Sequence, residues 1–370
     1  MTLAGAIRIE LRAGHPVMIR STRPLDLASR FCGLTPDGVL ARVPLLFTLC
    51  AKAQLHAAQL ALAAAQGRCL KRSQQPLLIE AALEYLWRFA IDLPRWAGQA
   101  AAMGPFASLR KGLLPPQLPA PEAARLLDRY LEEQLLGEPS TQWGGRSATE
   151  LCQWWEGSDS PAAQLLRAVA AVAPVAAPVT RETRGADKLL PATLTAQQLR
   201  QLAAAMEDPD FCRQPHWYGG QVETGALAYQ QHHPWIEALR ARGVCAAGLR
   251  LLARLLALLA LQQSLADPAS ARSYAGGLAL ASDATEAGSG IGWVNTARGV
   301  LLHRARCDGD RVSDYRILAP TEWNFHPDGV LAQGLAPWQA VAAAARERWL
   351  ALQVISLDPC VGYQLEVYDA

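Results

Sequence analysis

The sequence lacks any C-x-x-C pair, although eight of its 370 residues are cysteines. A zinc ribbon and a thioredoxin-like redox motif both depend on that spacing, so neither is indicated. The chain also lacks a charge excess, with 35 basic and 33 acidic residues and a net charge of +2. We therefore expect no general attraction to nucleic acid, and we expect most cysteines to be buried thiols.

The sequence has little that could enter a membrane. Near the N-terminus, Arg8 and Glu10 interrupt the apolar run that a signal peptide needs, so we expect a cytoplasmic protein. The most apolar stretch, residues 249–261, contains Arg250 and Arg254 and is shorter than a bilayer span. We predict that it forms a buried helix, and we expect no membrane partner.

The sequence is rich in apolar residues: 51% of its residues are hydrophobic and 18% are charged. A chain of this length and composition can bury a large core. Most segments have the composition and periodicity of helices, and strand-like alternation is confined to regions near the two ends. These patterns predict an α+β fold with a mainly α-helical bundle core and small peripheral β-hairpins or a small sheet. We expect residues 1–370 to form a single domain.

Three parts of the chain differ in these patterns. Residues 1–67 are predicted to form a hairpin and a first helix that carries a motif cysteine. Residues 68–285 are predicted to form a helical body with a loop near 173–194. Residues 286–370 are predicted to contain a β-hairpin that turns at 308–310, then a loop, a helix and a C-terminal tail.

The last part contains four motifs in a specific order. TARGVLLH, DGDRVSDY, PTEWN and SLDPC follow one another between residues 296 and 360. Together they resemble the C-terminal third of the nickel-iron hydrogenase large subunit, in which A-x-R-G-x-L-x-H, D-G-x-I-x-x-Y, P-T-x-W-N and S-F-D-P-C-x-x-C-x-x-H surround the metal centre. One such motif is weak, whereas the ordered set is highly specific. The resemblance implies a hydrogenase large-subunit-like fold.

Two further stretches extend the resemblance over the whole chain. LAGAIRIE resembles the family's opening I-E-G-H-L-R-I-E, with Ala4 and Ala6 where glutamate and histidine are expected. ETGALAY, at residues 223–229, is similar to the family's E-x-G-P-L-A-R. The middle of the chain, from about 70 to 220, matches only in its helical character.

The family also has a C-G-V-C-x-x-x-H motif, which FTLCAKAQ resembles. Cys50 is retained there, whereas Phe47 and Gln54 replace the first cysteine and the histidine. Cys32, in the run RFCG, is an alternative match. The family's motif leads into a long helix, and we predict a long helix through Cys50 but a turn after Cys32, so Cys50 is favoured.

The resemblance implies a nickel ion held by four thiolates, two of which bridge to an iron that carries two cyanides and one carbon monoxide. This sequence retains one cysteine of each pair, Cys50 and Cys360. Tyr363 takes the place of the last cysteine, and Glu366 that of the terminal histidine. A phenyl ring or a mostly protonated phenol does not replace a soft thiolate, so we expect no nickel. Because Ala4 stands where the family has a proton-carrying glutamate, we also expect no catalysis.

Groups that would face the ligands of the iron are retained. Arg298 is a permanently charged donor suited to a cyanide nitrogen, and Thr321, which follows Pro320, offers a hydroxyl. In the family the second cysteine of each pair holds the iron. Cys50 matches that position, whereas Cys360 matches a position that touches nickel only, so the iron geometry is expected to be shifted or Cys360 to act in handover.

This pattern resembles the HupK/HoxV-type hydrogenase accessory proteins. The resemblance implies a non-catalytic scaffold that transiently carries the Fe(CN)2(CO) unit for insertion into the hydrogenase large subunit, with hydrogenase maturation proteins as further partners. One alternative is a divergent hydrogenase-like redox subunit, against which the lost ligands argue. Another is a metal-free structural relative, like the quinone-site subunit of respiratory complex I, against which Cys50, Cys360 and Arg298 argue.

Overall fold

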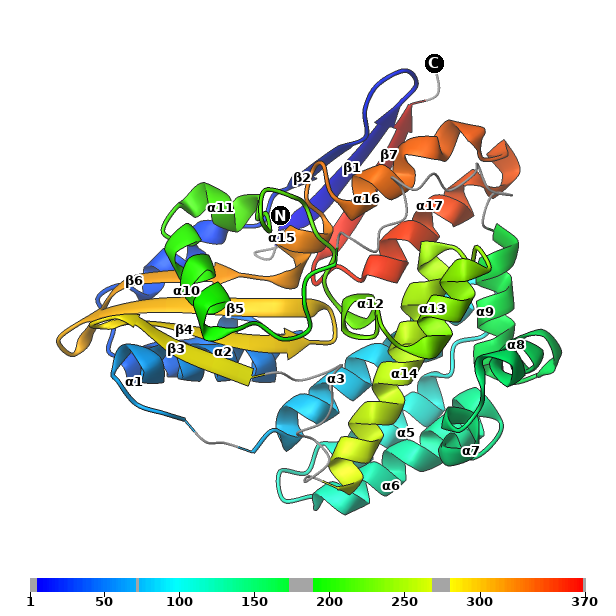
Figure 1. Ribbon diagram of the computed structural model, residues 1–370, viewed down its shortest axis with the longest axis horizontal. Coiled ribbons are helices and arrows are strands. Elements are labelled where there is room, and N and C mark those ends of the chain that lie inside the picture. The colour runs from blue at the N-terminus through cyan, green and yellow to red at the C-terminus, as the bar shows by residue number, and fades with distance from the viewer. Residues whose placement is uncertain (1–4, 71–72, 173–188, 268–279, 369–370) are drawn as a thin grey trace.

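The computed structural model describes residues 5–70, 73–172, 189–267 and 280–368 (Figure 1). Helices form most of the molecule and the strands form two separate sheets, which confirms the predicted α+β class with a mainly helical body. Ala4 lies outside the described residues, as does most of the loop predicted near 173–194.

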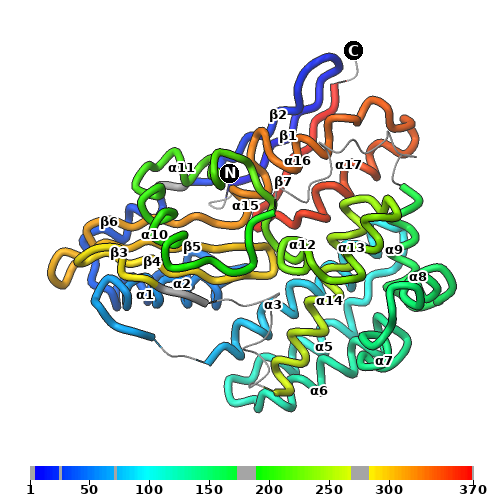
Figure 2. The backbone as a smooth tube through the Cα atoms, viewed as in Figure 1, coloured from blue at the N-terminus to red at the C-terminus, as the bar shows by residue number. Residues whose placement is uncertain are grey.

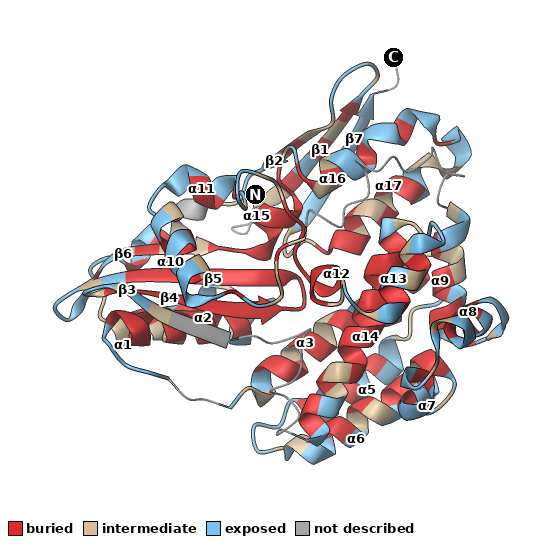
Figure 3. Ribbon diagram, in the orientation of Figure 1, coloured by how far each residue is buried: buried red, intermediate tan, exposed pale blue. Residues whose placement is uncertain are grey.

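The helical body is arranged around one long helix, α14. Its helices are α3 (Gln75–Trp87), α4 (Leu93–Trp96), α5 (Met103–Leu113), α6 (Ala120–Leu131), α7 (Ser140–Gly144), α8 (Ala148–Gly157), α9 (Pro161–Val172), α12 (Ala226–Tyr229), α13 (Pro234–Ala241) and α14 (Ala246–Ala266). Helix α14 packs against α3, α6, α9 and α13 and is buried along most of its length (Figure 3). The stretch 249–261 is therefore part of a core helix, as predicted.

Helix α14 is longer than its most apolar stretch suggested. Among the described residues it is the one helix that is long and apolar enough to cross a membrane, by length and composition alone. However, 78% of that apolar window is buried inside the structure. Burial against neighbouring helices accounts for its hydrophobicity.

A four-stranded antiparallel sheet packs beside this body. Its order is β3 (Leu280–Glu286), β4 (Ser289–Thr296), β5 (Gly299–Asp308) and β6 (Arg311–Leu318). Helix α2 (Ala51–Ala65) covers one face, and α10 (Ala196–Ala205) with α11 (Pro209–Arg213) lies on the other (Figure 1). A Cβ atom at Gly290 would lie 2.3 Å from the backbone nitrogen of Ala65, so glycine in β4 permits the close approach of α2.

The β5–β6 hairpin at 308–310 confirms the sequence prediction, whereas β3 and the turn that separates β4 from β5 were not predicted. Strand β4 is buried at every position, so both of its faces are covered and it shows little alternation of apolar and polar residues. The alternation of apolar and polar residues that usually marks a strand therefore could not show where β4 ends.

A smaller sheet places the N-terminal strands beside the C-terminal strand (Figure 2). Strand β1 (Ala6–Arg12) pairs antiparallel with β2 (Met18–Ser21), which confirms the predicted N-terminal hairpin. On its other side β1 pairs in parallel with β7 (Gly362–Tyr368), so the expected C-terminal tail is a strand. Ile7 lies opposite Tyr363, and Ile9 lies opposite Leu365.

The connection between the two sheets contains the short helix α15 (Pro320–Asn324) where a loop was expected, followed by α16 (Val330–Leu335) and the 3-10 helix η7 (Ala336–Ala340). It ends with α17 (Ala343–Leu357), which confirms the helix predicted before the C-terminal tail. Helices α16 and α17 cover the buried face of the small sheet, where Ile7, Ile9 and Leu11 meet Trp349 and Val354.

The single long helix predicted through Cys50 is wrong, because two helices occupy that region. Helix α1 (Pro36–Leu46) ends before Phe47, and α2 begins at Ala51. The turn predicted at residues 36–38, after Cys32, is instead the start of α1, where proline occupies a favoured first position and Thr35 accepts a hydrogen bond from the next turn. Cys50 therefore lies in a non-helical connection, directly before α2.

Candidate metal centre

Cys50 and Cys360 come from distant parts of the chain and lie at one site. Cys50 immediately precedes α2, and Cys360 lies between α17 and β7. Burial and the neighbouring Cys360 raise the pKa of Cys50 to about 12, so the two thiols are within electrostatic reach of each other. Cys32, the alternative match, is exposed at the end of the 3-10 helix η1 (Leu25–Phe31).

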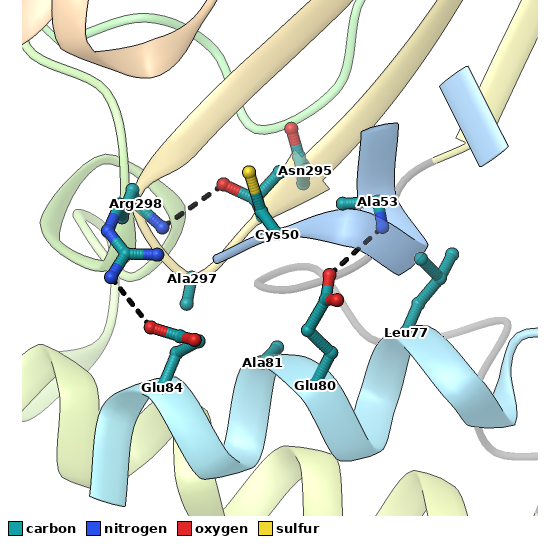
Figure 4. A pocket seen from close by; sticks show the side chains of 10 residues that line it. Cys50, Ala53, Leu77, Glu80, Ala81, Glu84, Asn295, Ala297 and Arg298 are labelled. Atoms are coloured by element: carbon teal, nitrogen blue, oxygen red, sulfur yellow. Dashed lines mark hydrogen bonds and ion pairs between the residues drawn. The ribbon is translucent and has the colours of Figure 1, made fainter. Parts of the chain in front are cut away.

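A narrow pocket lies beside Cys50, lined in part by Glu80, Glu84, Thr296 and Arg298 (Figure 4). Its free volume of about 10 Å³ is close to the room that one water molecule needs. An iron ion with three diatomic ligands is larger than this. Such a group would enter only if the lining of the pocket moved apart.

Arg298 is buried and is held by two carboxylates. Its Nε donates a hydrogen bond to Asp358 Oδ1 at 3.1 Å, and its Nη2 donates to Glu84 Oε2 at 2.6 Å. Burial lowers the pKa of Arg298, but the attraction of Asp358 and Glu84 outweighs that effect and the pKa is raised. Nη1 makes no hydrogen bond to a described protein group, so it is the guanidinium nitrogen that could donate to a ligand.

Asp358, from the SLDPC motif, is the common partner of several arginines. It is fully buried, has a left-handed backbone with φ of 56°, and forms ion pairs with Arg298 and Arg88. Burial raises its pKa, but Arg298, Arg88 and Arg254 outweigh burial and lower it. A left-handed non-glycine residue costs of order 1–3 kcal/mol, which the ion pairs offset. The turn before Cys360 is therefore fixed by its buried charges.

The end of α17 is held by arginines from α14. Arg250 donates to Ser356 Oγ at 3.1 Å, and Arg254 donates to the Ser356 carbonyl oxygen at 2.5 Å. Arg250 also forms two 2.8 Å hydrogen bonds to the carboxylate of Glu223, the first residue of the ETGALAY stretch. Arginines of α14 thus connect two motifs that are far apart in the sequence, ETGALAY and SLDPC.

Thr321 contacts the second cysteine. Its Oγ1 lies 3.0 Å from Cys360 Sγ and accepts a hydrogen bond from the Cys360 backbone nitrogen at 3.4 Å. Pro320 begins α15 and is buried with Thr321, so the short helix fixes the direction of the hydroxyl. The structure therefore brings Arg298, Pro320 and Thr321 to the same region as Cys50 and Cys360.

Arg23 is a second cation at this site that the sequence did not single out. Its Nη1 donates to Glu322 Oε1 at 2.5 Å, next to Thr321. Burial lowers the pKa of Arg23, but Glu322 and Cys360 outweigh burial and raise it, with a smaller contribution from Cys50. A lone arginine after a predicted hairpin carries no motif, so only the fold reveals its place.

Two carboxylates on consecutive turns of α3 fix the other side of the site (Figure 4). Glu80 accepts hydrogen bonds from the backbone nitrogens of Lys52 at 2.8 Å and Ala53 at 2.9 Å, and so caps α2 just after Cys50. Burial raises the pKa of Glu80 to about 7, although those hydrogen bonds lower it. Glu84, four residues later, holds Arg298. Two acidic residues four positions apart in an otherwise apolar helix were the feature of the sequence that could have identified Glu80 and Glu84 as site residues.

The four residues that stand where the hydrogenase family has metal-site cysteines and histidines lie in two different places. Phe47 packs against the apolar core near α2, and Gln54 donates a hydrogen bond to Cys50 Sγ at 3.7 Å. Tyr363 and Glu366 lie on β7, where Tyr363 is 37% exposed and Glu366 accepts a hydrogen bond from the hydroxyl of Tyr368. Within the described parts of the chain, no three His, Cys, Asp or Glu side chains are grouped so as to hold a metal ion.

Relatives of known name cover the whole chain. The hydrogenase expression/formation protein HoxV of Cupriavidus necator is 31% identical over 405 aligned residues, which span 100% of this chain and 98% of HoxV. The hydrogenase expression/formation protein HupK of Azotobacter vinelandii is 31% identical, with 100% of both chains covered. No protein-family profile matches the chain.

Solved structures with a similar fold include nickel-iron-selenium hydrogenases. A variant of the enzyme from Desulfovibrio vulgaris Hildenborough has a TM-score of 0.53 at 12% identity, covering 93% of this chain and 92% of that one. The reduced enzyme from Desulfomicrobium baculatum has a TM-score of 0.50 at 12% identity, covering 95% of each chain. At this identity the likeness shows the fold alone, and it confirms the hydrogenase large-subunit-like fold that the motifs predicted.

Proposed function

The chain belongs to the HupK/HoxV family of hydrogenase expression/formation proteins, and on that basis we propose that it is a non-catalytic accessory protein of hydrogenase formation. Its cargo is an iron ion with two cyanides and one carbon monoxide, Fe(CN)2(CO), which it holds transiently for insertion into the hydrogenase large subunit. The observation that carries this proposal is that Cys50 and Cys360 lie together beside the buried Arg298.

The number of protein ligands supports a metal that brings ligands of its own. Phe47 has no donor atom, and burial raises the pKa of the Tyr363 phenol, so neither position supplies the soft thiolate that a nickel site of this kind needs. An iron that already carries three diatomic ligands requires fewer donors from the protein. Two thiolates are soft anchors of the right type for it.

The charges at the site support an anionic cargo. The two cyanides and the two thiolates are negative, and Arg298 and Arg23 both interact electrostatically with Cys50 and Cys360. Since the pKa of Cys50 is raised to about 12, the thiol is protonated in the free protein near pH 7. Iron binding must therefore displace a proton, which keeps the free site closer to neutral and makes loading reversible.

Transfer of the cargo defines the partners of the protein. Hydrogenase maturation proteins would supply the iron unit, and the hydrogenase large subunit would receive it, in the cytoplasm. The small pocket beside Cys50 supports a scaffold that opens to load and to release. A hydrogenase-like redox role would need a nickel ligand at Phe47, where the side chain packs against apolar neighbours instead.

Infrared spectroscopy tests this proposal on protein purified without oxygen from cells that express the maturation machinery. We expect cyanide and carbonyl stretching bands and iron without stoichiometric nickel. Cys50→Ala and Cys360→Ala should each abolish the bands, whereas Cys32→Ala, the control for the alternative match, should keep them. One nickel per chain, or bands that are lost only in Cys32→Ala, would refute the assignment.

A further inference from the structure

A hydrogen-bonded network of three side chains reaches Cys50 from inside the large sheet. Gln54 Nε2 donates to Cys50 Sγ at 3.7 Å, His303 Nε2 lies 2.8 Å from Gln54 Oε1, and His303 Nδ1 lies 2.8 Å from the hydroxyl of Tyr315. Gln54 is 2% exposed, and both His303 and Tyr315 are fully buried. We call Gln54, His303 and Tyr315 the Gln54 network; it links α2 to β5 and β6.

The network has a single direction when Cys50 is a thiolate. Burial lowers the pKa of His303 to about 3, so the imidazole is neutral and has one donor nitrogen and one acceptor nitrogen. Burial raises the pKa of Tyr315, so the phenol keeps a proton to donate. If Tyr315 donates to Nδ1, His303 donates from Nε2 to the amide oxygen of Gln54, and the amide N–H points at Cys50. The reverse order would direct an oxygen at a negative sulfur.

We propose that Gln54 is a positioning residue that gives the Cys50 sulfur a permanent hydrogen bond, with its amide fixed in that direction by His303 and Tyr315. This inference rests on the proposed function and deepens it. A donor to a ligating sulfur withdraws electron density from the metal and tunes the strength of the metal–sulfur bond. An amide neither ionises nor competes as a metal ligand, so it can act only through Cys50.

A merely structural role would have a different signature. If the Gln54 network only satisfied buried polar atoms, either hydrogen-bond direction would satisfy them equally well. Its removal would then lower the stability of the protein without changing the electronic state of a bound metal. The carbonyl stretch of the iron unit separates the two roles, because it falls when more electron density reaches the iron.

The first experiment compares infrared spectra of the loaded wild-type protein with those of Gln54→Leu, Tyr315→Phe and Gln59→Leu. Gln59, on the same helix and half-buried, is the matched control. We expect the carbonyl band to move to lower wavenumber in Gln54→Leu, to move less in the same direction in Tyr315→Phe, and to stay in place in Gln59→Leu. An unmoved band in Gln54→Leu would overturn the proposal, and a band that moves in Gln54→Leu but not in Tyr315→Phe would refute the role of the network.

The second experiment needs no iron and uses the full-length protein with 15N-labelled histidine. The seven histidine signals are assigned with the help of a His303→Asn variant. We expect His303 to be neutral with its proton on Nε2 from pH 5 to pH 8. A proton on Nδ1 would turn the amide oxygen toward the protonated Cys50 thiol of the metal-free protein, and it would overturn the proposal that the hydrogen bond from Gln54 to the sulfur is permanent. If the wild-type protein shows no cyanide or carbonyl band, the proposed function fails, while this measurement still decides the direction of the Gln54 network.

Discussion

Replacing Glu80 by glutamine should change how the stability of the protein depends on pH. Glu80 is largely buried, and burial raises its pKa from 4.5 to about 7. A carboxyl group whose pKa is raised in the folded state contributes stability that is fully present below pH 4.5 and is lost as the pH rises through 7. The difference between the two pKa values corresponds to about 3 kcal/mol.

Most of that loss falls in an accessible range of pH. Linkage places about 2–3 kcal/mol of it between pH 5 and pH 8. Urea denaturation of the metal-free protein at both values should show a loss of stability that is larger in the wild type than in Glu80→Gln by about this amount, because glutamine cannot ionise. Glu150→Gln is the control, because a helix cap lowers the pKa of the exposed Glu150 and its effect lies below this range.

The result that would refute the reasoning is a stability difference between wild type and Glu80→Gln that is the same at pH 5 and pH 8. Glu80 would then ionise normally, and it would not be the buried cap of α2. The position of Cys50, which immediately precedes α2, would have to be fixed by packing against β4 and β5 alone.

The remaining tests address the arginine, the C-terminal strand and the missing cysteines. Arg298→Lys should leave the circular-dichroism spectrum unchanged but shift the cyanide bands, because an ammonium group does not reproduce the planar guanidinium; unchanged bands would place Arg298 outside the reach of the iron. Backbone amides of β7 should exchange with deuterium faster than those of β4, and equal protection would argue against opening at the tail. Phe47→Cys combined with Tyr363→Cys should retain more metal and slow its transfer, lowering hydrogenase activity in a strain with the double variant as its only copy; wild-type activity would show that weak holding is not why the cysteines are absent.

The sequence predicted the convergence of distant motifs but not the elements that produce it. Ordered motifs imply a shared site without a knowledge of strand pairing, and so Arg298, Thr321 and Cys360 were expected together. The break between α1 and α2 was not expected, because Ala, Leu and Gln between Pro44 and Gly67 all favour a continuous helix. Tertiary contacts of the connection that contains Cys50 outweigh that local preference.

The residues that the sequence missed are ordinary polar side chains whose neighbours are distant in the chain. Glu80 and Arg23 belong to no motif, and their partners Ala53 and Glu322 are 27 and 299 residues away. Strand β7 is a different case, because Tyr363, Leu365 and Val367 alternate with polar residues and carried a strand signal. The same residues match the metal-binding tail of the hydrogenase family, and that match predicted a tail, whereas their alternation predicted a strand.

Cys50 is held by contacts on two sides, whereas the chain after Cys360 is held on one side only. This difference indicates which part of the site would move when a bound metal is released. Cys50 is held from one side by the Glu80 cap and from the other by Gln54. Asp358 is fixed by buried ion pairs, so the turn before Cys360 resists movement. Beyond Cys360, β7 pairs with β1 along one edge only, and most of its side chains remain exposed.

Displacing an exposed edge strand such as β7 exposes little apolar area, whereas moving Asp358 would separate buried charges. Release should therefore begin with β7 leaving β1, which pulls Cys360 away from Thr321 while Cys50 and Arg298 stay in place.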